Sequence, residues 1–277
     1  MRFGAHSQML VHDLDDAALW IFDRGREWGL DALELHVADP DTFPVDGVRS
    51  AAERAGLEVV LGTALQAHNS TVSDDPEIRV RGLRHLKGCI DVAARIGARK
   101  ICGGLHSANG HFVGRGRTNQ EWDRSVAALR EAGEYAGERG IILTVEPVSR
   151  YSGYFLNTAA DAVTLVDEVG LPNVGIQLDT FHMNIEESDP AAAIRLAGRR
   201  LMHFHAVENN RGVPGTGQVP WADCFAALRD VGYDDLCVFE FFPLDLPVMA
   251  VRTHTWRELA TSKQVAVEGM RNLKNLQ

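Results

Sequence analysis

The chain has 277 residues, of which 45% are hydrophobic, 24% charged and 7% aromatic, a composition typical of a folded globular protein. Its 28 Lys and Arg residues against 38 Asp and Glu residues give a formal net charge of −10, which disfavours nucleic acid and anionic membranes as partners. No stretch approaches the roughly 18 apolar residues of a membrane span, and the four scattered cysteines form no CxxC pair, so we expect a cytoplasmic protein.

Short runs rich in Val, Ile and Leu alternate along the chain with longer amphipathic stretches. The runs predict eight β-strands, at residues 2–7, 32–37, 58–65, 100–106, 142–147, 174–180, 201–208 and 235–242. Between and after them, apolar residues recur three and four positions apart, which predicts helices that include 75–98, 119–140, 158–170 and 256–275.

Eight strand–helix units of about 35 residues each favour a single (β/α)8 barrel domain over residues 1–277. An open Rossmann-type sheet is disfavoured because no strand is followed by GxGxxG. The glycine-rich segment at 211–221 follows the seventh strand, where it forms either an active-site loop or a mobile surface turn.

Ionisable residues stand at or near the ends of several of these strands, where an inward-facing position would usually be Val, Ile or Leu. The carboxyl ends of the strands carry the chemistry of such barrels. The residues are His6, His106, Glu146, Asp179, His205 and Glu240.

The last four of these come from the neighbouring strands five to eight. Three carboxylates and one imidazole form a hard, oxygen-rich ligand set that suits Mn²⁺, Co²⁺ or Mg²⁺, and we expect one divalent ion there. For any one of these residues the alternative is a buried ion pair with a basic side chain such as Arg150, Arg211 or Lys100.

Glu146 and Glu240 stand at the two ends of this row, so they would face each other across the barrel mouth. That arrangement suits removal of a proton from one face of a planar intermediate and its return to the other face, as sugar isomerisation and epimerisation require. His182, Arg211 and His106 lie in loops at the same end, where they would either contact substrate or support the fold.

Four segments resemble blocks of the D-tagatose 3-epimerase and D-psicose (allulose) 3-epimerase family, within the xylose isomerase-like barrel superfamily: 143–158, 174–190, 203–221 and 238–242. The resemblance implies a divalent metal, Mn²⁺ first, held by Glu146, Asp179, His205 and Glu240, with the two glutamates as the acid–base pair. It also implies that His182 and Arg211 hold the C1–C2 end of a ketose, which is epimerised at C3 through a cis-enediolate. Family members are commonly dimers or tetramers.

Two departures from this family affect the expected substrate. Ser152 stands where the family usually has a substrate-binding glutamate, and His6 and Ser7 stand where aromatic residues usually follow the first strand. We therefore expect Ser152 and His106 to contribute to a different pattern of substrate hydroxyl contacts.

Other functions remain open at this point. The same residues could perform enediolate chemistry on inososes, or on 3-oxo sugars as in the lyases that cleave C-glycosides with a small partner subunit. Phosphodiester cleavage of the endonuclease IV type is disfavoured by the net charge of −10. A non-catalytic sugar-binding barrel would be expected to lack part of the ligand set.

Overall fold

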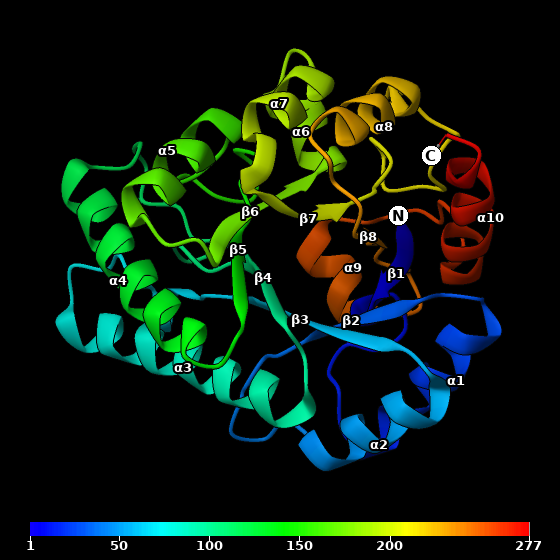
Figure 1. The fold of residues 1–277 in the computed structure, drawn as a ribbon, viewed down its shortest axis with the longest axis horizontal. Helices are drawn as coiled ribbons and strands as arrows, with labels where there is room; N and C mark the ends of the chain where they lie inside the picture. Colours follow the sequence, from blue (N-terminus) through cyan, green and yellow to red (C-terminus); the bar gives the residue numbers. More distant parts are fainter. Residues whose placement is uncertain (277) are drawn as a thin grey trace.

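A computed structural model describes residues 1–276. Its eight strands form a closed parallel barrel in chain order, with β1 paired to both β2 and β8 (Figure 1). The strands are β1 (Arg2–His6), β2 (Ala32–His36), β3 (Glu58–Ala64), β4 (Lys100–Gly104), β5 (Ile142–Val145), β6 (Val174–Asp179), β7 (Leu201–His205) and β8 (Leu236–Phe239). The predicted barrel and all eight predicted strands are confirmed.

Helices surround the barrel (Figure 1). Those of the described residues are α1 (Trp20–Glu27), α2 (Val45–Ala55), α3 (Pro76–Ile96), α4 (Asn119–Gly137), α5 (Ala159–Val169), α6 (Thr180–Glu186), α7 (Pro190–Ala197), α8 (Trp221–Asp230), α9 (Pro247–Thr253) and α10 (Ser262–Lys274). Three of the predicted helices match α3, α4 and α5. No helix in residues 1–276 has the length and apolar content that a bilayer crossing demands.

The prediction of a helix from residue 256 was wrong at its start, because α10 begins only at Ser262. Thr261 precedes it and forms a capping box: its hydroxyl accepts from the Gln264 amide, and the Gln264 side chain accepts from the Thr261 amide. The apolar spacing of 256–260 continues the helical pattern, but this cap fixes the helix boundary after it.

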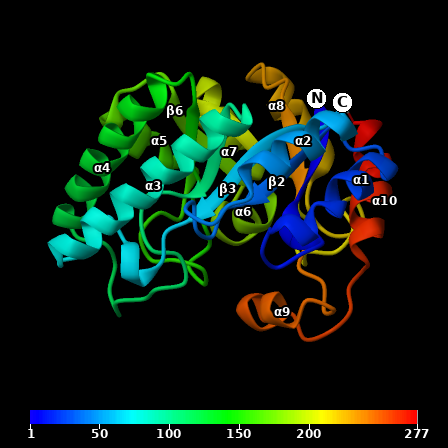
Figure 2. The same cartoon turned by 90° about the horizontal axis from the view of Figure 1, so that it is seen from below.

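The register of the barrel places the predicted site residues at one level. In the ladder between β6 and β7, Asp179 lies opposite His205, and a bulge at Ile176/Gln177 adjusts the register below them. Glu146 and Glu240 each follow the last residue of a strand. Figure 2 shows α9 set apart from the surrounding helices, beyond the end of the barrel where these residues lie.

Candidate active site

A cavity of about 510 Å³ opens at the carboxyl end of the barrel. Its walls come from all eight strands or from the residues directly after them, as expected for a barrel of this kind. Three carboxylates line it, those of Glu34, Glu146 and Glu240, together with two guanidinium groups, those of Arg211 and Arg252. The cavity is therefore lined by charged groups of both signs.

The structure distributes the four predicted metal ligands over two overlapping groups of three residues. One ligand atom from each of Asp179, His205 and Glu240 lies within 4.8 Å of the other two, and the same holds for Glu146, Asp179 and His182. Asp179 belongs to both groups. It therefore links Glu146, which follows β5, with Glu240, which follows β8.

Two atoms in this cluster are buried and have no hydrogen-bond partner: Asp179 Oδ2 and His205 Nδ1. They lie 3.8 Å apart, too far for a hydrogen bond and close enough for one ion to touch both. The other Asp179 oxygen accepts from the Phe181 amide at 2.6 Å, which fixes the orientation of the carboxylate. Because buried polar atoms are rarely left unpaired, these residues fit a divalent cation.

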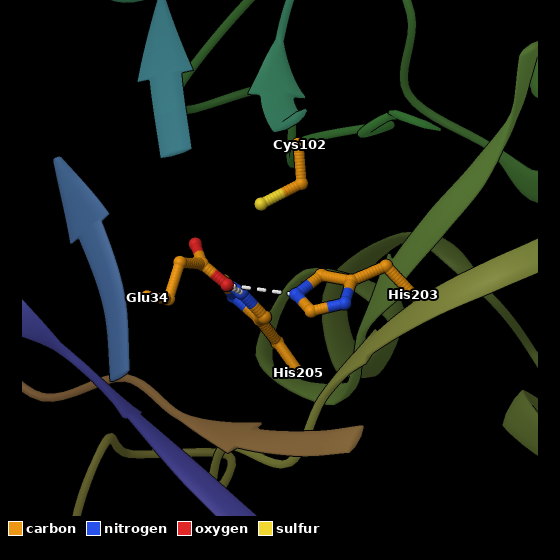
Figure 3. A group of neighbouring side chains, drawn as sticks. All are labelled: Glu34, Cys102, His203 and His205. Atoms are coloured by element: carbon orange, nitrogen blue, oxygen red, sulfur yellow. Dashed lines mark hydrogen bonds and ion pairs between the residues drawn. The ribbon is translucent and has the colours of Figure 1, made fainter. Parts of the chain in front are cut away.

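Glu34 on β2 holds the other side of His205, as Figure 3 shows. Its Oε2 accepts from His205 Nε2 at 3.0 Å and from His203 Nε2 at 2.7 Å, and the glutamate is only 2% exposed. Since a carboxylate only accepts, the Nε2 positions carry the protons and His205 Nδ1 is left for the cation.

Without a cation, the electrostatics of this pair favour the doubly protonated, charged form of His205. Burial alone would raise the pKa of Glu34, but attraction to His205 and the two hydrogen bonds hold it well below its usual range. Burial would lower the pKa of His205, but Glu34 raises it well above the usual value. A cation that binds Nδ1 therefore displaces a proton from His205.

Sequence reasoning missed Glu34, although a signal was present. An acidic residue in the middle of the predicted strand 32–37 should have prompted a search for its partner. Cys102 on β4 completes the group drawn in Figure 3. Its thiol donates to the Leu61 carbonyl at 3.2 Å. Burial raises the pKa of Cys102 well above its usual value, so it remains a thiol.

The two glutamates expected to move protons have opposite pKa shifts. Burial, reinforced by repulsion from Asp179 and Glu240, raises the pKa of Glu146 well above its usual range. Burial acts in the same direction on Glu240, but attraction to Arg211, His205 and His6 outweighs it and lowers the pKa to about 2. Two carboxyl groups with separated pKa values are typical of an acid and a base that share one substrate.

Arg211 forms an ion pair with Glu240, and its guanidinium lies over the rings of Phe181 and Phe242, at 4.2 and 4.7 Å from their centroids. Its backbone has φ 57°, a conformation that non-glycine residues rarely adopt. The loop around it is held by Glu208, a buried carboxylate that accepts from the amides of Gly215 and Val219 and from Trp221 Nε1.

The remaining predicted residues have different surroundings. His182 lines the cavity, and its Nδ1 accepts from the Ser149 amide at 3.1 Å, which turns Nε2 toward the site. Burial lowers the pKa of His182 to about 4, so the ring is neutral near pH 7. Ser152 also lines the cavity.

The structure does not place His106 on the cavity wall. Its Nε2 donates to the backbone carbonyl of Glu146 at 2.9 Å, its Nδ1 lies 2.9 Å from the Ser107 hydroxyl, and its ring stacks on Phe155. With both ring nitrogens engaged, His106 supports the backbone that carries Glu146.

The family model for the xylose isomerase-like TIM barrel matches residues 22–276. The chain belongs to the xylose isomerase-like TIM barrel family.

Similar members of this family are sugar epimerases. The D-psicose 3-epimerase of Enterocloster bolteae is 37% identical over 243 residues, which cover 86% of this chain and 81% of that protein. The L-ribulose 3-epimerase of Mesorhizobium japonicum is 34% identical over 236 residues, covering 84% and 79%. A crystal structure of D-allulose 3-epimerase from Methylomonas sp. with D-allulose superposes with a TM-score of 0.95 at 30% identity, covering 100% of this chain and 97% of that one. The predicted resemblance and isomerase class are confirmed.

Proposed function

We propose that this xylose isomerase-like barrel is a divalent-metal-dependent ketose 3-epimerase. The observation that carries the proposal is the placement of Glu146 and Glu240 on the same cavity, with the unpartnered atoms of Asp179 and His205 in the same cluster. Glu146, Asp179, His205 and Glu240 would hold the ion. Mn²⁺ is our first choice, with Co²⁺ or Mg²⁺ as alternatives.

When bound, the cation would supply positive charge that stabilises negative charge on substrate oxygens and so acidifies the hydrogen on C3. His182 Nε2 and the Arg211 guanidinium hold the C1–C2 end of the ketose. One glutamate takes the C3 proton and leaves a planar cis-enediolate across C2 and C3. The glutamate on the opposite side, which starts protonated, then gives its proton to the other face of C3 and so inverts that carbon. The two glutamates end with exchanged protonation states, and proton exchange with water restores the starting state.

The decisive experiment follows deuterium entry into free ketoses in D₂O with Mn²⁺, read by NMR. Deuterium at C3 together with the C3 epimer would support the proposal and identify the sugar class. Exchange that occurs only with inososes or 3-oxo-glycosides would replace it with the related enediolate chemistry on those sugars.

One observation favours retaining the reaction on inososes or 3-oxo-glycosides as a second candidate function. The 3-dehydro-D-guloside 4-epimerase of Escherichia coli is 30% identical over 217 residues, covering 72% of this chain and 81% of that protein. Ser152 leaves this part of the cavity wall uncharged, which could also suit a larger sugar derivative. Under the lyase form of this alternative, a small partner subunit would be required.

We also propose that the chain forms a homo-oligomer, a dimer or a tetramer. Several large apolar side chains are exposed in the segments that follow the strands, including Phe112, Tyr151, Trp256 and, in α9, Val251. Light scattering of the purified protein tests this, and a monomer at micromolar concentration would contradict it.

A further inference from the structure

Arg252 is an exposed cation at the wall of the cavity. It lies in α9, which Figure 2 shows beyond the barrel mouth, and it lines the cavity together with Thr253 and His254. Within residues 1–276, its guanidinium forms no hydrogen bond or ion pair with the rest of the chain. The other arginine of the cavity, Arg211, is paired with Glu240.

Arg252 lies away from the ligand cluster. The ring of the ligand His205 is 6.5 Å from that of His6, and His6 is 6.1 Å from His36, so three rings extend from β7 across β1 to β2. Arg252 acts on His36, the last of them: burial, with repulsion from His6 and Arg252, lowers the pKa of His36 to about 3. His36 is therefore neutral, and Arg252 supplies the positive charge on this wall.

The three carboxylates of the cavity interact with groups other than Arg252. Glu34 holds two imidazoles, Glu240 pairs with Arg211, and Glu146 belongs to the ligand cluster. None of them forms an ion pair with Arg252. A guanidinium on a cavity wall without a counter-charge from the protein is suited to an anionic group of the ligand, which it can bind through two parallel hydrogen bonds.

We propose that the substrate is a ketose whose far end carries an anionic group, a carboxylate or a phosphate, and that Arg252 binds this group. The inference rests on the proposed function, because a sugar held at C1–C2 by His182 and Arg211, with C3 between the two glutamates, has C4 to C6 left to contact another part of the cavity wall. A cavity of about 510 Å³ is within the size range of sites for ligands larger than a simple fragment.

The test compares wild type with Arg252→Ala on matched substrates: a neutral ketose, its terminal phosphate and its terminal carboxylate. We expect kcat/KM for the preferred anionic substrate to fall at least tenfold, mainly through KM, while the value for the neutral ketose stays within twofold. Arg252→Lys should recover part of the loss. The anionic substrate with the higher kcat/KM shows whether the group that Arg252 binds is a phosphate or a carboxylate.

Arg257→Ala is the matched control, because Arg257 is exposed like Arg252 but does not line the cavity. It should leave all three substrates unchanged. The proposal is overturned if wild type shows no preference for either anionic substrate, or if Arg252→Ala lowers activity equally on neutral and anionic substrates.

A binding measurement separates this inference from the proposed reaction. D-Glucitol 6-phosphate, D-gluconate and D-glucitol have no ketone to epimerise, so calorimetry with them reports binding alone. We expect one of the anions to bind at least tenfold more tightly than D-glucitol, with the advantage lost in Arg252→Ala and reduced by salt. If an anion binds in this way but no ketose is turned over, the proposed epimerase activity is refuted while the proposed anion site is supported. Equal affinity for all three would refute the anion site.

Discussion

Replacement of Glu34 by Gln tests how the cation site is held. The substitution keeps the shape of the side chain but removes its negative charge, and Glu34 Oε2 accepts hydrogen bonds from both His203 and His205. Hydrogen bonds to charged groups contribute about 1.5–3 kcal/mol each, so we expect a loss of several kcal/mol of unfolding free energy at most. Loss of a carboxylate that orients a metal-binding histidine typically weakens metal affinity about 10–100-fold.

The assay is isothermal titration of Mn²⁺ into chelator-treated protein, paired with urea unfolding of the same samples. His203→Gln is the matched control: its amide can still donate to Glu34, and the contact between Glu34 and His205 remains. We expect this control to lose stability while it keeps wild-type cation affinity. If Glu34→Gln binds Mn²⁺ as tightly as wild type, then Glu34 does not set the orientation of His205.

Four further outcomes are expected. Glu240→Gln should retain the fold and lose most turnover, and a rate above a tenth of wild type would be inconsistent with its proton-transfer role. A chelator should abolish activity and lower the melting temperature, with Mn²⁺ or Co²⁺ restoring both; an enzyme insensitive to chelation would refute the metal site. Ser152→Glu should shift activity toward free ketohexoses, and an unchanged substrate profile would make this position neutral. Burial lowers the pKa values of His36 and His106 to about 3 and about 4, so the unfolded chain binds protons first as pH falls below the ordinary 6.5. Stability should therefore decrease from about pH 6.5 to about pH 4, and a urea midpoint that stays constant over this range would contradict the neutral burial of these rings.

The candidate ligands could be located from sequence because each stands at the end of an apolar strand. Asp179 and His205 end β6 and β7, and Glu146 and Glu240 follow β5 and β8 directly. Local pattern was enough here, since all parallel strands of a closed barrel end at the same rim. The pattern could not show which way a loop side chain points, so His106 was expected at the substrate and instead contacts the Glu146 backbone.

The sequence by itself determined the eightfold alternation, the strand positions and the rim on which the ionisable residues gather. These follow from periodicity, which each segment carries locally. Only the tertiary structure decided the long-range pairs: Glu34 meets His205 across 171 positions, and Arg252 in α9 comes to the cavity that β2 and β7 line. Such contacts depend on barrel closure and register, and no spacing along one strand or helix encodes them.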